Sequence, residues 1–393
     1  MSEKQVRDEM RNVDNAAGAG LGQVAAAFIK LGFTAFGGPA AAYAMMRQEF
    51  VVRRRWLTED EFLDFLGIAN IVPGPNATEL AILIGFKQGG WAGLIVAGAA
   101  YILPAMAIVL GLAWGYVRFG ALPELTGILN GVKPVVVAIL LAALAGMLKP
   151  RLKQPAGLVL VGVVFLAYLG GISPLVLLIA GAVLMALIRG VQSSESGWFS
   201  LLLLPFFADP LRVLAERAVF SIWRLFWLFL KAGALMYGSG YVLLAFIHDD
   251  LVVRMGWLTE SQLVDAIAVG QVTPGPLSTT ATFVGYLLGG VPAALLATLA
   301  MFLPSFIFVG IVYFAVNKLR ESRLVRTLLD GVNFAALGLM AGVTWEIGRA
   351  ALVDPLAMLI AVLAVILIWR FKVDPPWLVL CGALVGLARV MLG

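Results

Sequence analysis

The chain has 393 residues, of which 61% are hydrophobic and only 13% are charged, and its mean hydropathy is +0.97. Soluble domains carry roughly a quarter charged residues, so this composition argues against a soluble domain and predicts a membrane protein with several spans. The formal net charge of +5 is distributed over the loops and does not indicate nucleic-acid binding. The single cysteine excludes an internal disulfide. With only one histidine as well, the chain offers few groups for a metal, a cofactor or catalysis.

The expected organisation is an N-terminal tail over residues 1–20, a membrane repeat over 21–189, a connector over 190–218 and a second membrane repeat over 219–393. The tail has no apolar core or cleavage site, so we expect no removable signal peptide. The connector contains an apolar run, Trp198–Phe207, that is too short to span and is typical of an interfacial segment.

The two repeats share a pattern that recurs after 201 residues. Trp56-Leu57-Thr58-Glu59 returns as Trp257-Leu258-Thr259-Glu260, and a Pro-Gly-Pro motif follows each copy. Duplicated halves in a membrane protein are typical of transporters whose site lies between the repeats. We expect an all-α polytopic protein with five crossing helices per repeat. They are placed at 21–46, 91–117, 125–148, 155–169 and 173–189, and at 220–247, 291–316, 327–348, 355–370 and 376–391.

Loop charges predict that the repeats lie in opposite orientations. One loop carries three consecutive arginines, Arg53–Arg55, whereas its equivalent carries Asp249 and Asp250. The loop after residue 148 is basic, and its equivalent holds Arg349 and Asp354. Because positive charge favours the cytoplasmic side, equivalent loops should face opposite compartments, as an inverted repeat requires. The alternative is chance scatter of a few arginines.

The first crossing of each repeat contains a glycine-rich break, Gly37-Gly38 in one and Gly238-Ser239 in the other. Lys30 and Lys231 lie seven residues before these breaks, which is two helical turns and therefore the same helix face. A lysine inside the membrane is costly and marks a candidate functional site. The alternatives are close helix packing for the glycines and snorkelling of the lysines toward the headgroups.

Between the first and second crossings, each repeat should contain a re-entrant helical hairpin. Thr58 and Glu61 form a capping box that starts a short helix, and the second repeat has the same device. Pro73-Gly74-Pro75 and Pro274-Gly275-Pro276 then stop each helix, because proline lacks an N–H and disfavours helix in the residue before it. One kinked spanning helix is the alternative interpretation.

The second helix of each hairpin should begin near the middle of the membrane, with its free N–H groups and positive dipole end directed between the repeats. Small polar residues gather at these ends: Asn70, Asn76 and Thr78, and Gln271, Thr273, Ser278, Thr279 and Thr280. With the two lysines and the two Pro-Gly-Pro motifs, they form a candidate site for a tetrahedral dianion. The alternative role of the polar residues is capping of the helix ends.

Glu79 is an acidic residue inside an apolar run, Ala77–Phe86, and is a candidate for proton exchange during transport. It also lies three residues after Asn76, at the position of a capping box, which requires no function. The sequence leaves both roles open.

Lys30–Pro39, Trp56-Leu57 and the two Pro-Gly-Pro motifs with Thr280-Ala281-Thr282-Phe283 resemble the chromate ion transporter family in its long, two-domain form. The resemblance covers nearly the whole chain. It implies a multi-pass carrier of the bacterial inner membrane that exports chromate, with sulfate as the similar oxyanion, coupled to the proton-motive force. Members often carry a histidine after Gly-Gly-Pro, where this chain has Ala42 and Tyr43, and a glutamine where it has Glu79.

We therefore expect a secondary transporter, not an enzyme, that works by alternating access, with an oxyanion and the lipid bilayer as partners and neither cofactor nor metal. A homodimer is compatible with the sequence. Uptake of sulfate or another anion, a passive channel and, remotely, a membrane-embedded enzyme are the alternatives. The single histidine and cysteine, His248 and Cys381, offer little for the last of these.

Overall fold

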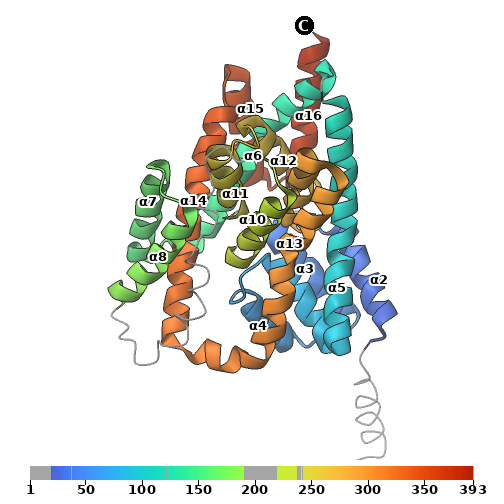
Figure 1. Ribbon diagram of the computed structural model, residues 1–393, viewed down its shortest axis with the longest axis vertical. Coiled ribbons are helices and arrows are strands. Elements are labelled where there is room, and N and C mark those ends of the chain that lie inside the picture. Colours follow the sequence, from blue (N-terminus) through green and yellow to red (C-terminus); the bar gives the residue numbers. More distant parts are fainter. Residues whose placement is uncertain are drawn as a thin grey trace, which may run out of the picture.

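The structure is a computed structural model that describes residues 19–36, 38–120, 122–189, 219–236, 240 and 242–392. Most of the expected tail, the connector, Gly37, Gly238 and Ser239 lie outside the described residues. Every regular element in the described residues is a helix, which confirms the all-α prediction (Figure 1).

The first repeat contains α2 (Leu21–Thr34), α3 (Gly38–Arg47), η1 (Gln48–Arg53), α4 (Glu59–Ala69), α5 (Asn76–Phe119), α6 (Pro123–Leu148), η2 (Lys149–Arg151), α7 (Pro155–Leu169) and α8 (Pro174–Ile188). The second contains α10 (Ile222–Leu235), α11 (Val242–Ile247), η4 (His248–Arg254), α12 (Glu260–Val272), η5 (Leu277–Thr279), α13 (Thr280–Glu321), α14 (Arg323–Ala351), α15 (Pro355–Phe371) and α16 (Pro375–Met391).

The first segment of each repeat, which we expected to cross the membrane, folds back on itself. After α2 the chain returns through α3 and the π-helix η1, so that the rings of Phe28 and Phe50 lie 4.8 Å apart. The N–H of Ala19 donates to the Gln88 side-chain oxygen, and the Gln88 amide donates to the carbonyl of Trp56. Ala19, Trp56 and Gln88 therefore lie together, so the chain between them enters and leaves on one side.

The second repeat follows the same course. Phe220, just before α10, packs against Trp257, with the ring centroids 5.2 Å apart. A Cβ atom on Gly289 would lie 2.9 Å from the Phe220 ring. The expected crossings at 21–46 and 220–247 are thus wrong. The physical reason is length: α2 and α10 have 14 residues each, about 21 Å at 1.5 Å per residue, whereas the hydrocarbon is ~30 Å thick.

The Pro-Gly-Pro segment forms a second hairpin in each repeat, as predicted. Capping boxes begin α4 at Thr58 and α12 at Thr259. Lys87, near the end of the returning limb, forms an ion pair with Glu61 in the first turn of α4. The returning limb thus ends where the hairpin begins, which excludes one kinked spanning helix in the first repeat.

Glycine pairs separate each returning limb from the crossing helix that follows. Gly90 in α5 and Gly290 in α13 have φ values of +58° and +68°, which glycine adopts without the penalty of a Cβ atom. By length and composition, four helices of the described chain can cross a membrane, one each within α5, α6–η2, η5–α13 and α14. The apolar helices α7, α8, α15 and α16 have only 15–17 residues, so five long crossings per repeat are not present in the described chain.

The repeats exchange their last two helices. α15 and α16 pack on α6 of the first repeat, and α7 and α8 pack on α14 of the second. Glycines allow close contact: a Cβ on Gly131 would lie 2.1 Å from the Gly382 carbonyl oxygen, and one on Gly331 would lie 2.4 Å from that of Gly181. The equivalent helices α4 and α12 lie toward opposite ends of the long axis (Figure 1). The repeats are therefore inverted and interlocked.

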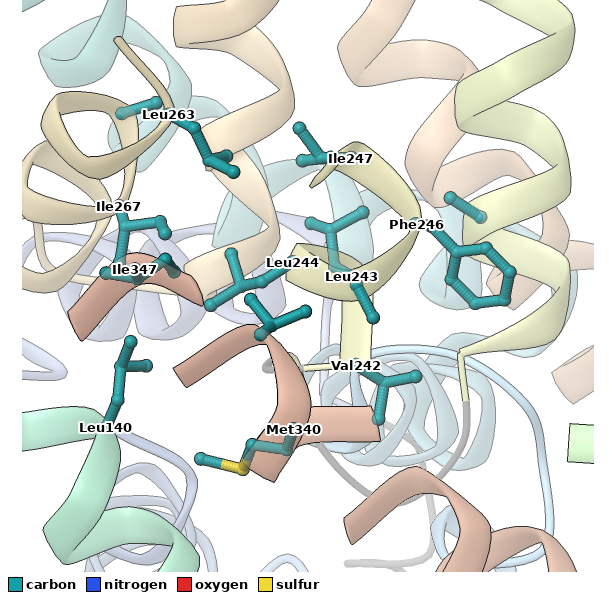
Figure 2. Close-up of a cluster of buried hydrophobic side chains, with 14 of the residues drawn as sticks. Leu140, Val242, Leu243, Leu244, Phe246, Ile247, Leu263, Ile267, Met340 and Ile347 are labelled. Atoms are coloured by element: carbon teal, nitrogen blue, oxygen red, sulfur yellow. The ribbon is translucent and has the colours of Figure 1, made fainter. Parts of the chain in front are cut away.

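The helix α11 lies within the apolar core. All six residues of α11 are buried. Figure 2 shows five of them, Val242, Leu243, Leu244, Phe246 and Ile247, in one cluster with Leu140 of α6, Leu263 and Ile267 of α12, and Met340 and Ile347 of α14. This packing holds the first hairpin of the second repeat inside the bundle, where its tip faces the first repeat.

Candidate functional site at the hairpin tips

The tips of the hairpins from both repeats meet through two equivalent hydrogen bonds. The N–H of Gly74 donates to the carbonyl of Met236 at 2.6 Å, and the N–H of Gly275 donates to the carbonyl of Ala35 at 2.9 Å. Each Pro-Gly-Pro segment therefore contacts the broken helix of the other repeat. We call Ala35, residues 70–75, Met236 and residues 273–279 the hairpin tips.

Backbone conformation fixes the two central glycines. Gly74 has φ +143° and Gly275 has φ +92°, values that other residues rarely adopt. A Cβ on Gly74 would lie 1.8 Å from Oε1 of Glu79 and 2.5 Å from Oγ of Ser305. The motif thus ends one helix, turns the chain and lets its backbone approach the side chains of the opposite repeat.

The start of α5 carries polar atoms that the protein leaves without partners. Pro75 is the N-cap and cannot supply a side-chain cap. The Asn76 amide donates to Oδ1 of Asn70 at 2.6 Å. Oδ1 of Asn76, Oγ1 of Thr78 and Oε2 of Glu79 are buried without a hydrogen-bond partner in the described chain. Buried polar groups are normally paired, so these atoms indicate a place for a bound group.

Glu79 does not serve as a cap. It is the fourth residue of α5, its side chain is fully buried, and Oε1 accepts a 3.3 Å hydrogen bond from the Ser305 hydroxyl of α13. The capping-box alternative for Glu79 is therefore wrong, because Pro75 rather than Asn76 is the N-cap and Glu79 lies one residue beyond the N3 position. Tyr43 lies beside Glu79, and the buried Tyr101 lies beside Tyr43.

The second repeat contributes a matching tip with fewer orphan atoms. Oγ of Ser278 and Nε2 of Gln271 are buried without a partner in the described chain. The hydroxyls of Thr273, Thr279 and Thr280 donate to nearby carbonyl oxygens at 2.7–2.9 Å. Each of these bonds joins a hydroxyl to a carbonyl oxygen three or four residues earlier in the chain. None of them caps a helix N-terminus, because a capping side chain accepts a hydrogen bond from an N–H.

The structure gives each lysine a carboxylate partner within its own hairpin. Nζ of Lys30 lies 3.3 Å from Oε2 of Glu49, and Nζ of Lys231 lies 2.6 Å from Oδ2 of Asp250. Both acids are buried and also bind arginines, such as Arg254 with Asp250 at 2.8 Å. Each ion pair joins the two limbs of one hairpin, so each ammonium group points to an acid of its own repeat and not toward the lysine of the other repeat. Direct contact of the lysines with an anion stays a prediction.

Sequence reasoning missed Glu49, Asp250, Tyr43, Tyr101 and Ser305 as members of these clusters. The sequence does contain a signal for Glu49 and Asp250, because an acid lies 19 residues after the lysine in both repeats. Tyr101 and Ser305 lie on long apolar helices beside a repeated Leu-Pro pair, Leu103-Pro104 and Leu303-Pro304, which marks the positions but does not indicate contact with Glu79. The described residues contain no group of acidic, histidine or cysteine side chains that could hold a metal.

The family model described as Chromate transporter matches residues 22–186 and, a second time, residues 223–387. Together the two matches cover most of the chain. The chain belongs to the chromate transporter family.

Relatives of this family align over nearly the full length. A chromate transport protein from Cupriavidus metallidurans is 31% identical over 374 residues, 93% of this chain and 92% of the relative. A probable chromate transport protein from Synechococcus elongatus is 31% identical over 93% of this chain and 95% of its own, and a chromate transport protein from Pseudomonas aeruginosa is 30% identical over 93% and 91%. No solved structure matches the chain.

The two matches to the chromate transporter family coincide with the two structural repeats. One family unit thus consists of two re-entrant hairpins followed by the crossing limb of α5 or α13 and three further helices. Membership confirms the resemblance seen in the sequence and identifies the protein as a multi-pass membrane transporter.

Proposed function

We propose that this protein carries a tetrahedral oxyanion, chromate or the similar sulfate, across the bacterial inner membrane, and that the hairpin tips bind it. The observation that carries the proposal is the pair of reciprocal hydrogen bonds, Gly74 to Met236 and Gly275 to Ala35, around orphan polar atoms. A site shared by two inverted repeats near the membrane midplane is the usual arrangement of secondary transporters.

Helix N-termini and hydroxyls would hold the anion at the tips, while Lys30 and Lys231 are paired with Glu49 and Asp250. The first-turn N–H groups of α5 have no side-chain cap, and the orphan hydroxyls of Thr78 and Ser278 are donors. A helix N-terminus is equivalent to about half a positive charge and is a common binding place for oxyanions. Partial charges bind a dianion more weakly than buried cations would, which suits a carrier that must release it.

Glu79 would make anion binding depend on a proton. An ionised Glu79 beside the anion is repulsive, whereas the protonated acid is neutral and can donate a hydrogen bond. Protonation of Glu79 and binding of the oxyanion should therefore favour each other. Proton exchange is therefore the role proposed for Glu79, which does not cap α5.

Membrane potential can supply the driving force for export. Moving one charge through 100 mV is worth ~2.3 kcal/mol, so a dianion that leaves a cell with a negative interior and releases its proton inside gains ~4.6 kcal/mol. A tenfold gradient costs about 1.4 kcal/mol, so export against a concentration ratio of about a thousand is feasible. Rocking of the interlocked repeats about the tips would give alternating access.

Flux measurements on purified protein in proteoliposomes test the proposal. Radiolabelled chromate and sulfate should move in a saturable way, faster with an imposed potential, and compete with each other. A flux that does not saturate indicates a passive channel, and absence of flux for both anions rejects the proposed substrate class.

Uptake is a second candidate direction, and the buried acid Glu79 favours it specifically. If one proton accompanies each anion, an inward pH gradient drives accumulation in vesicles that have no opposing membrane potential. Acidifying the outside of the vesicles should then raise anion uptake, whereas an exporter driven by potential alone shows no such increase.

A further inference from the structure

A cavity of about 580 Å³ lies beside α12, away from the hairpin tips. The starts of α6, α12 and α15 and the ends of α14 and α16 surround it, so both repeats contribute to its wall. We call the side on which these helix ends lie the α12 face. Loop charges predict that this face is extracytoplasmic.

One cation of the cavity wall also contacts a buried acid. Nζ of Lys133 lies 2.8 Å from Oγ of Ser261, 3.3 Å from Oδ1 of Asn130 and 3.6 Å from Oδ1 of Asp265. The Lys133 side chain is 15% exposed and that of Asp265 only 3%. The ammonium therefore stands between the cavity and the carboxylate and has access to both.

The pairing of Asp265 is incomplete. Oδ2 accepts a 2.9 Å hydrogen bond from the Tyr116 hydroxyl, but Oδ1 has no hydrogen-bond partner in the described chain. Tyr116 of α5 and Lys133 of α6 are the ionisable groups that interact with this carboxylate among the described residues. Arg389 and Asp354 line the cavity as an ion pair of 2.6 Å. On the neighbouring η4, His248 contacts Glu260 instead.

We propose that this cavity binds the oxyanion on the α12 face, and that the anion there replaces Asp265 as the partner of Lys133. The idea rests on the proposed function, because it places a second, outer site on the route to the hairpin tips. The Ser261 hydroxyl and the Asn130 amide can donate to the same anion. The volume is within the usual range for small-molecule pockets.

Exchange of partners on Lys133 links the anion to a proton. When the anion takes the ammonium, Asp265 is left as a buried carboxylate without a counterion, which is costly. It then takes a proton from water, and it releases that proton when the anion leaves and Lys133 returns. Anion binding in the cavity should therefore strengthen as the pH falls, and this dependence requires Asp265.

Cysteine protection tests the site in the intact protein. Thr126 lines the cavity and is exposed, so Thr126→Cys in a Cys381→Ala background reports access by an impermeant maleimide. Sulfate is the probe, with isethionate as the ionic-strength control. Sulfate should slow the labelling, and Lys133→Gln should abolish this protection. Lys153→Gln, an exposed lysine outside the cavity, is the matched control and should change nothing.

Asp265→Asn separates the proposal from a purely structural ion pair. If the carboxylate competes with the anion, sulfate should protect the cysteine at position 126 at about tenfold lower concentration in the Asp265→Asn variant. This protection should also no longer depend on pH. Two results overturn the proposal. One is weaker protection by sulfate in Asp265→Asn than with Asp265 present, and the other is no protection by sulfate when Lys133 and Asp265 are both unchanged. Flux of labelled sulfate and chromate is measured in the same vesicles. Flux without protection rejects the cavity site and retains the proposed function. Protection without flux retains the cavity site and rejects the proposed function.

Discussion

Replacing Gly74 with alanine tests whether the contact between the hairpin tips organises the site. The added Cβ meets Oε1 of Glu79 at 1.8 Å and Oγ of Ser305 at 2.5 Å, so at least one side chain must move. The residue also has φ +143°, which alanine rarely adopts. Backbone strain of ~1–2 kcal/mol and overlap of ~1–3 kcal/mol add up to about 2–5 kcal/mol.

Gly90→Ala is the matched control for this substitution. Gly90 also has a positive φ, +58°, but a Cβ there would have no atom within 4 Å. It therefore carries the backbone strain of ~1–2 kcal/mol without the overlap and lies outside the tips. Comparing the two variants isolates the crowding between Gly74, Glu79 and Ser305.

The assay is flux of labelled chromate or sulfate per folded protein, together with the unfolding temperature in detergent. Gly74→Ala should lower the flux at least about tenfold, because the 2.6 Å hydrogen bond to Met236 cannot survive a shift of the tip. Gly90→Ala should lose a few degrees of stability and keep most of the flux. Equal flux in the two variants would refute the reasoning.

Three further predictions follow from the described contacts. Asp60→Cys and Ser261→Cys, at equivalent exposed positions in a Cys381→Ala background, should be labelled from opposite sides of the membrane; labelling from one side rejects the inverted arrangement. Glu79→Gln should keep anion binding and lose the response to a pH gradient in flux assays, and a silent variant rejects proton coupling at Glu79. Burial and the adjacent aspartate raise the pKa of Asp249 to about 6, so its contribution to stability is fully present below its ordinary pKa and is lost as the pH rises through 6. Asp249→Asn should therefore stabilise the protein by roughly 2–3 kcal/mol at pH 7.5 but not at pH 3, as measured by thermal unfolding.

Local signals predicted the hairpins of the Pro-Gly-Pro segments well. The capping boxes at Thr58 and Thr259 fix where α4 and α12 begin, and proline geometry fixes where they end, so both are determined by a few adjacent residues. The duplication located the polar tips for the same reason. These features depend on short-range chemistry that is visible in the sequence.

Tertiary contacts decided what the sequence could not. The course of residues 21–53 depends on Phe28 meeting Phe50 and on Lys30 meeting Glu49, and apolar periodicity is the same for a crossing helix and for two limbs of a hairpin. Ser305 contacts Glu79 across 226 residues, and no pattern in the sequence indicates that these two positions meet. The hydrophobic pattern thus predicts helices but leaves their partners open.

The reciprocal hydrogen bonds at the tips also constrain how the sequences of the two halves can evolve. The N–H of Gly74 bonds the carbonyl of Met236, and the N–H of Gly275 bonds the carbonyl of Ala35. Each half therefore depends on the other to satisfy the backbone N–H of its central glycine. A substitution that shifts one Pro-Gly-Pro turn therefore selects for compensation in the opposite half, not in its own. The chain is in this sense a fused antiparallel pair, and its halves, expressed as two separate polypeptides, should assemble again through these contacts.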